Sequence, residues 1–240
     1  MQRRQFSGQS LTVIGGMVLG LWAAPTTVAQ AAATPLADLT AGEASQGLKA
    51  ALERGVVFAV GQLGRPGGFL QNPAVRIPLP GFLNDASGAL RMMGMGQRLD
   101  ELVTAMNRAA EAAVPMARDL LVNTIQSMSV SDAKGVLTGG DTAATDYFAR
   151  ATRSQLFARF LPVAARATEN VGAAAQYNQI AGKVSSFGLV KAEEAKLENY
   201  IANRALDGLY LMIGEEEKKI RQNPLAAGSD LLRKVFGGLK

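Results

Sequence analysis

Apolar residues recur about every 3.6 positions along most of this chain, and no segment shows sustained alternation of apolar and polar residues. The first pattern places apolar side chains on one face of a helix, whereas alternation is typical of a half-buried strand. A sequence of 240 residues is also long enough to bury a sizeable core. The periodicity therefore predicts an all-α, single-domain helical bundle with antiparallel packing.

Interruptions of this period mark the ends of the predicted helices. Long helices are expected over 45–64, 97–128 and 191–221, and short ones over 82–94, 129–139 and 229–236. Ser129 and Asp132 have the spacing of a capping box at the start of a helix. Asp141 is expected to cap a further long helix that runs to about Ala175.

Prolines interrupt the helical period between residues 64 and 81. Because a residue that precedes proline avoids the helical conformation, this segment is expected to be an extended, apolar strap with room for one short strand. Pro115 and Pro162 instead fall inside predicted long helices, where each removes one backbone hydrogen bond and predicts a kink. Such a kink opens a cavity or, more commonly, wraps the helix around the core.

Residues 1–31 have the pattern of a cleavable signal peptide, with a basic start, an apolar middle and small residues before a cleavage site at Ala31. The apolar middle, 11–24, is too short to span a bilayer comfortably. This pattern predicts export to the periplasm, a flexible lead-in over 32–44 and a helical domain over 45–240. It also predicts that no transmembrane segment remains in the mature chain.

Arg3-Arg4-Gln5-Phe6 is similar to a twin-arginine export motif. Gln2, Ser7 and Gly8 depart from the usual residues of that motif, so an ordinary Sec signal stays the alternative route. No cysteine follows the apolar stretch, and we therefore expect the protein not to be lipidated.

The chain contains no histidine and no cysteine. These absences exclude Ser-His-Asp and Cys-His catalysis and the usual zinc sites, and they argue against an enzyme. Removing Arg3 and Arg4 with the leader leaves 23 basic against 20 acidic residues, too small an excess to favour nucleic acid as a partner. No cofactor and no metal site is predicted.

Several polar residues lie within or beside apolar stretches of the predicted helices. Asp207 interrupts the otherwise apolar run 205–213, so it is expected to be buried and paired, most simply with an arginine or a helix N-terminus. Asn107, Glu111 and Arg118 share one edge of an apolar helical stripe, where they are expected to bridge to neighbouring helices or, less commonly, to form a binding site.

The acidic and basic run 215–221 has two pairs at the favourable i,i+4 spacing, Glu215 with Lys219 and Glu217 with Arg221. A solvated helix end is the main interpretation, and a cation site shared with Asp132 or Asp141 is the alternative. The complete candidate set, as a ligand site or a structural polar cluster, is Asn107, Glu111, Arg118, Asp132, Asp141, Asp207, Glu216 and Arg221.

A series of short segments occurs in a fixed order along the chain. They include Gly47–Leu52, Gly68–Pro73, Ile77–Pro80, Met106–Glu111, Gly139–Thr145, Ala205–Leu209, Glu215–Arg221 and Leu232–Gly237. Together they resemble the domain-of-unknown-function family 4197, a set of exported bacterial proteins, from about Gly47 to Gly237. The resemblance implies a helical domain and an envelope location, but it implies no activity. Some relatives carry a lipidated cysteine after the leader, which this chain lacks.

Three functions are consistent with these patterns. The first is non-catalytic binding of a partner or an apolar ligand between the helices. The predicted kinks suggest it, and so do helix faces rich in methionine and phenylalanine. The alternative interpretation is that these residues are ordinary core. They are Met92, Met93, Met95, Phe157 and Phe160. The second is a carboxylate-based or cation-dependent hydrolase that uses Glu111, Asp132, Asp141 and Asp207 together. The third is a structural or interaction module.

Overall fold

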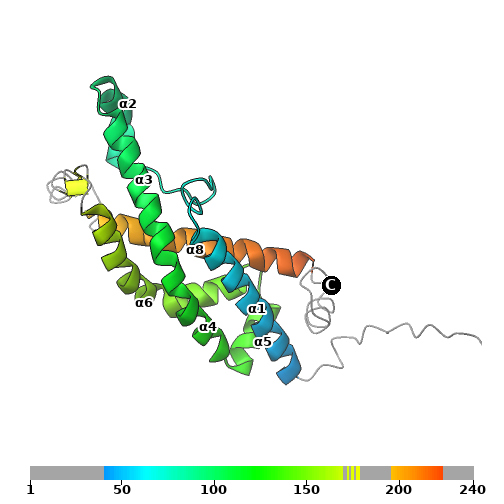
Figure 1. Ribbon diagram of the computed structural model, residues 1–240. Coiled ribbons are helices and arrows are strands. Elements are labelled where there is room, and N and C mark those ends of the chain that lie inside the picture. The colour runs from blue at the N-terminus through cyan, green and yellow to red at the C-terminus, as the bar shows by residue number, and fades with distance from the viewer. Residues whose placement is uncertain (1–40, 170–171, 173, 176, 179–195, 224–240) are drawn as a thin grey trace, which may run out of the picture. The chain divides into compact units, whose positions relative to one another are not determined.

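The computed structural model describes residues 41–169, 172, 174–175, 177–178 and 196–223, all of them within the unit Thr34–Lys240. Regular structure in this part of the chain is helical throughout, which confirms the all-α prediction (Figure 1). The elements are α1 (Ala41–Leu63), α2 (Gly81–Met92), α3 (Gly96–Ala113), the 3-10 turn η2 (Val114–Ala117), α4 (Arg118–Gln126), α5 (Val130–Thr138), α6 (Ala143–Thr168) and α8 (Leu197–Gln222).

Most predicted boundaries agree with these elements. The capping box of α5 is present, because Ser129 Oγ accepts from Asp132 N at 3.0 Å and the Asp132 carboxylate accepts from Ser129 N at 3.1 Å. α1 begins at Ala41, inside the predicted lead-in, and α6 ends at Thr168 instead of near Ala175. The predicted leader and the predicted helix over 229–236 lie outside the described residues.

The segment predicted as one helix over 97–128 is helical from Gly96 to Gln126, but it is divided into three elements around Pro115. α3 ends at Ala113, Pro115 lies in the 3-10 turn η2, and α4 follows from Arg118. Proline has no N–H for the hydrogen bond to the carbonyl four residues earlier, and its ring crowds that carbonyl, so the chain tightens into a 3-10 turn there. α6 continues through Pro162 as helix, and the kink expected at that position stays a prediction.

The core forms where α3, α6 and α8 pack together, and α1 packs against α4, α5 and α8. α6 and α8 are antiparallel, since Thr145 contacts Glu217 whereas Thr152 contacts Tyr210. Phe160 of α6 is fully buried, as plain core. No helix among the described residues is long and apolar enough to cross a membrane.

The strap between α1 and α2 contains turns over 66–75 and an extended stretch over 76–80, without the short strand that the sequence allowed. Asn107 of α3 takes the place of a strand partner. Its side-chain oxygen accepts from Ile77 N at 2.8 Å, and its side-chain nitrogen donates to Ile77 O at 2.9 Å. One fully buried amide side chain therefore satisfies both backbone groups of a buried residue.

Candidate functional site

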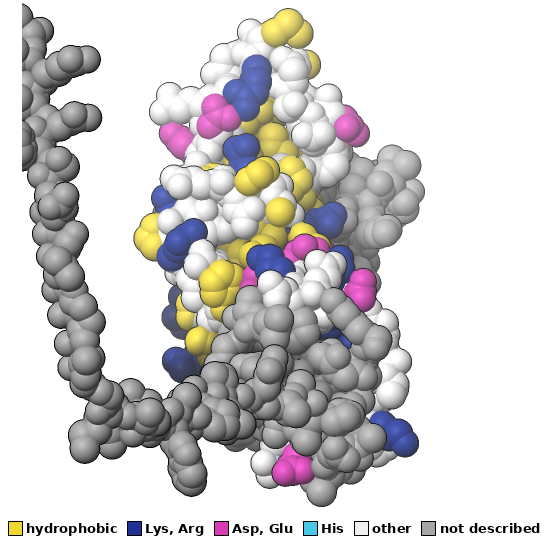
Figure 2. Space-filling model, turned by 90° about the vertical axis from the view of Figure 1, so that its right-hand side faces the viewer, with side chains coloured by type: hydrophobic (Ala, Val, Ile, Leu, Met, Phe, Trp, Pro, Cys, Tyr) yellow, Lys and Arg dark blue, Asp and Glu magenta, His cyan; other side chains and the backbone are white. Residues whose placement is uncertain are grey.

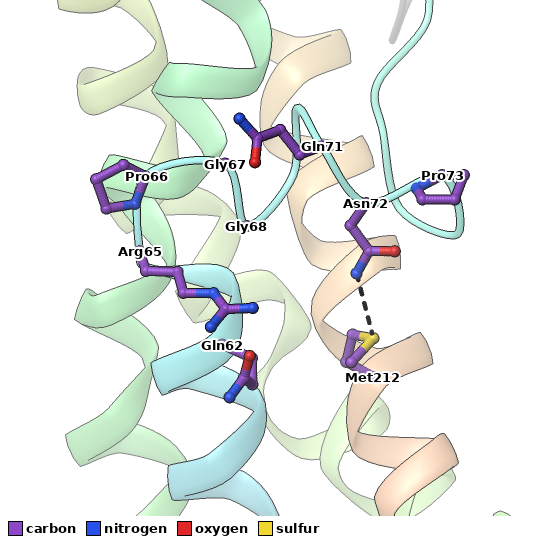
Figure 3. Close-up of a pocket in the computed structure, with 9 residues that line it drawn as sticks. All are labelled: Gln62, Arg65, Pro66, Gly67, Gly68, Gln71, Asn72, Pro73 and Met212. Carbon is purple, nitrogen blue, oxygen red and sulfur yellow. Dashed lines mark hydrogen bonds between the residues drawn. The ribbon is translucent and has the colours of Figure 1, made fainter.

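A cavity of about 470 Å³ opens between the end of α1, the first part of the strap and α8. Its lining, drawn in Figure 3, comprises Gln62, Arg65, Pro66, Gly67, Gly68, Gln71, Asn72, Pro73 and Met212. Gln62 and Arg65 lie on the side of α1, opposite Asn72 and Met212 on the side of α8. The lining thus contributes one guanidinium and three carboxamides, and it contributes no carboxylate.

Two glycines allow the loop to fold tightly against the last turn of α1. Gly67 has a φ of +86°, in the left-handed region that favours glycine. A Cβ at Gly68 would lie 2.3 Å from the carbonyl oxygen of Leu63 and 2.6 Å from that of Gln62. Because the nearest atoms are backbone, no side-chain rotation could relieve this contact. The backbone of the loop therefore forms one wall of the cavity directly.

Glu111 of α3 holds the same loop from the protein interior. Its Oε1 accepts from Phe69 N and from Leu70 N, both at 3.1 Å, and its Oε2 accepts from Arg108 at 2.7 Å. Burial by itself raises the pKa of Glu111, but these hydrogen bonds outweigh it and hold the pKa below its ordinary value. The carboxylate is therefore charged at neutral pH, and it ties two successive amides of the loop to α3.

Asn107 and Glu111 lie four residues apart on α3, on one face of the helix. Asn107 binds the strap at Ile77, and Glu111 binds it at Phe69 and Leu70. The sequence predicted bridges to neighbouring helices from this edge. The structure shows that the two side chains bind a non-helical segment, because the strap crosses the apolar stripe at this point.

Glu217 of α8 forms a second buried network. Its carboxylate accepts from Ala144 N at 3.0 Å, from Thr145 N at 2.9 Å and from the Thr145 hydroxyl at 2.8 Å. Arg221 donates to the same carboxylate and also to Val136 O, each at 2.8 Å. One ion pair on α8 therefore ties the start of α6 to the end of α5.

This network corrects two predictions. Asp141 is exposed and does not cap α6, since Glu217 binds the first amides of that helix instead. The charged end of α8 is not simply solvated either, because Glu217 is 5% exposed. The predicted pair of Glu217 with Arg221 is present, whereas Glu215 pairs with Lys218 at 3.2 Å.

Asp207 has the predicted arginine partner, but the prediction that it is buried was wrong. Its side chain is 46% exposed and lies 2.7 Å from Arg153 and 3.6 Å from Arg204. Leu211, one turn further along α8, is 45% exposed. Arg204, Asp207 and Leu211 thus form a stripe of α8 that faces solvent, because the neighbouring helices cover only the other sides.

The remaining candidates lie apart from the cavity. Asp132 is the third residue of α5 and completes the capping box with Ser129, Arg118 is exposed at the start of α4, and Glu216 pairs with Lys219 at 2.6 Å. Among the described residues, no group of three or more acidic side chains lies close enough to hold a metal ion. The predicted set therefore does not converge on one site.

Sequence reasoning missed Arg65, Gln71 and Asn72 as site residues. The available signal was Gly67-Gly68 followed by Gln71-Asn72-Pro73, a loop sequence already noted for its resemblance to a family. Neither helical periodicity nor charge spacing marks such a loop, since the side chains converge only through backbone turns.

The fold and the cavity together define an all-α domain with a polar, loop-built pocket. The sequence model of the family described as "Protein of unknown function (DUF4197)" matches residues 38–237, which include the whole strap. The chain belongs to this family. No curated protein and no solved structure matches this chain.

Proposed function

We propose that the protein is a non-catalytic binding protein whose strap cavity takes a small molecule bearing a carboxylate or a phosphate. The observation that carries this proposal is the lining itself, in which Arg65 is the single charged residue. A guanidinium offers several donors in a planar fork that matches such oxyanions. Gln62, Gln71 and Asn72 add side-chain amides that can donate to further oxygens.

The size of the cavity supports a small ligand, because about 470 Å³ lies in the usual range for small-molecule sites. Its chemistry supports a polar ligand over the apolar one suggested by the sequence. The apolar contributions come from Pro66, Pro73 and Met212. An apolar ligand would cover the amides and the guanidinium without offering them partners, which costs free energy.

No observation favours the alternative of a carboxylate-based hydrolase. Glu111 binds loop amides, Asp132 binds Ser129 in the capping box of α5, and Asp207 pairs with two arginines. No two of these carboxylates share a hydrogen-bond partner among the described residues, so they do not form the convergent pair that acid-base catalysis needs.

The direct experiment is calorimetric titration with inorganic phosphate and with citrate, with glucose as an uncharged probe. We expect the two anions to bind and glucose to bind more weakly. Arg65→Ala should weaken anion binding by roughly 10- to 100-fold, the usual effect of losing a charge-assisted hydrogen bond. The matched control is Arg76→Ala, which removes the same charge from an exposed position on the same strap. Equal losses in the two variants would show that general surface charge, and not the pocket, attracts the anion.

We also propose that this binding takes place in the periplasm after export. The support is the signal-peptide pattern of residues 1–31 in the sequence. Cell fractionation should recover a chain that starts at Ala32. Lysine at both Arg3 and Arg4 should block export if the twin-arginine route is used, and unimpaired export would assign the Sec route.

A further inference from the structure

Two methionines are almost fully exposed where α2 turns into α3. Met92 is 86% exposed and Met93 is 75% exposed. α2 packs chiefly against α3, and in Figure 1 the turn between them lies away from α1, α4 and α5. The top of the molecule is the same in Figures 1 and 2, and hydrophobic side chains are visible there in Figure 2. Both of these adjacent methionines are therefore accessible from solvent.

The backbone of the turn is a Schellman motif, which closes the end of a helix through a left-handed residue. Gly94 has a φ of +81°. Gly94 N donates to Arg91 O at 3.0 Å, and Met95 N donates to Leu90 O at 2.9 Å. The turn therefore wraps a third methionine, Met95, back toward the end of α2.

This motif accounts for one of the three methionines. A hydrophobic contact between the positions of Leu90 and Met95 commonly accompanies a Schellman motif, and Met95 is only partly exposed. Met92 and Met93 have no comparable packing role, because they remain largely in solvent. What distinguishes the turn chemically is three thioether sulfurs within four residues.

We propose that the sulfurs of Met92, Met93 and Met95 form a binding site for a soft monovalent cation, Cu(I) or its redox-inert analogue Ag(I). Thioether ligands select such ions over harder cations. Methionine is unbranched with three rotatable bonds, so side chains that start from one tight turn can bring their sulfurs together around an ion. Binding forms sulfur–metal bonds from lone pairs and releases no proton.

The electrostatics of the turn do not oppose a cation. The C-terminus of α2 carries partial negative charge and the N-terminus of α3, which begins at Gly96, carries partial positive charge, so the two helix ends offset each other. The nearest guanidinium, Arg91, is neutralised by Asp100 through contacts of 2.5 and 3.2 Å. Arg98 is the other charged residue close to the turn in sequence. A thioether sulfur carries no titratable proton, so we expect the affinity to be unchanged between pH 6 and pH 8.

The test is titration of the whole chain with silver nitrate in chloride-free buffer, followed by anaerobic competition for Cu(I) with a chromophoric chelator. We expect one ion per chain and binding at least about tenfold weaker when Met92, Met93 and Met95 are all replaced by leucine. Leucine keeps the volume and apolar character of the side chain. Circular dichroism and thermal unfolding should therefore show an unchanged fold.

Single variants supply the matched control. Met92→Leu and Met93→Leu should each weaken binding, whereas Met116→Leu removes an exposed thioether on η2 and should leave it unchanged. Wild-type affinity in the triple variant would overturn the proposal, and so would an equal loss in Met116→Leu. An affinity that falls steeply below pH 7 would also overturn it, because protonation-sensitive ligands would then be responsible.

Discussion

Glu111 and Glu217 are both buried carboxylates with similar partners, yet their surroundings differ. Each accepts from two successive backbone amides of a distant segment and from an arginine within one turn of its own helix. Glu111 holds a loop, and that loop lines a cavity of about 470 Å³. Glu217 holds the first turn of α6, and the nearby cavity is about 10 Å³, barely the space for one water molecule.

The segment that the carboxylate holds, and not the carboxylate itself, therefore decides whether a space remains beside it. A helix end presents its amides in one direction and packs closely against a neighbouring helix. The loop after α1 turns at Gly67 and Gly68, and its backbone leaves a space beside the wall that Glu111 anchors. The same interaction therefore stabilises a closed junction in one place and an open pocket in the other.

The two sites also differ in how deeply the arginine is buried. The side chain of Arg221 is 12% exposed, whereas that of Arg108 is 46% exposed. Removal of Glu217 leaves a nearly buried charge without its carboxylate, but removal of Glu111 leaves a cation that can turn to solvent. Burial is thus expected to set the order of the energetic effects.

Glu217→Ala should produce the largest loss of stability, about 3–5 kcal/mol, because it breaks a buried pair and leaves two amides of α6 without their acceptor. Urea denaturation measures this change in the free energy of unfolding. Glu215→Ala is the matched control on the same helix, at a position whose side chain is 47% exposed, and should cost less than about 1 kcal/mol. Similar costs for the two variants would contradict the assignment of Glu217 as the buried junction.

Glu111→Gln should cost about 1.5–3 kcal/mol at pH 7, since the glutamine keeps the shape but loses charge-assisted hydrogen bonds. The folded-state pKa of Glu111 lies below its ordinary value of 4.5. Its stabilising contribution is therefore fully present above that value and is lost as the pH falls through the folded-state pKa. Urea denaturation at several pH values should show the difference between wild type and variant shrinking below about pH 4.5. A difference that grows on acidification would have the wrong sign for this carboxylate.

Asp207→Ala should have the smallest effect, below about 1 kcal/mol, because Asp207 and Arg153 are both roughly half exposed. The effect should diminish further in high salt, which screens exposed ion pairs. A loss of about 3 kcal/mol or more is the range expected for a buried pair. Such a loss would support the expectation from the sequence that Asp207 is buried.

Features that depend on interactions between residues close together in the sequence were predicted correctly, and features that depend on distant residues were not. The capping box at Ser129 and Asp132 was predictable, because its hydrogen bonds join residues three apart. The cap of α6 was not, since Glu217 lies 72 residues from Thr145 and competes with the adjacent Asp141. The role of Glu111 was half predictable: its place on the edge of the stripe was visible in the sequence, but its partner was not.

The helical class, most helix boundaries and the interruption by proline between α1 and α2 follow from the amino-acid sequence alone, because periodicity, caps and proline act within one or two turns of the chain. The packing of the helices against one another places Asp207 in solvent, brings Glu217 to the start of α6 and leaves a polar pocket beside the strap. These outcomes depend on which helices lie against one another, and burial and long-range hydrogen bonds exist only once that packing is complete.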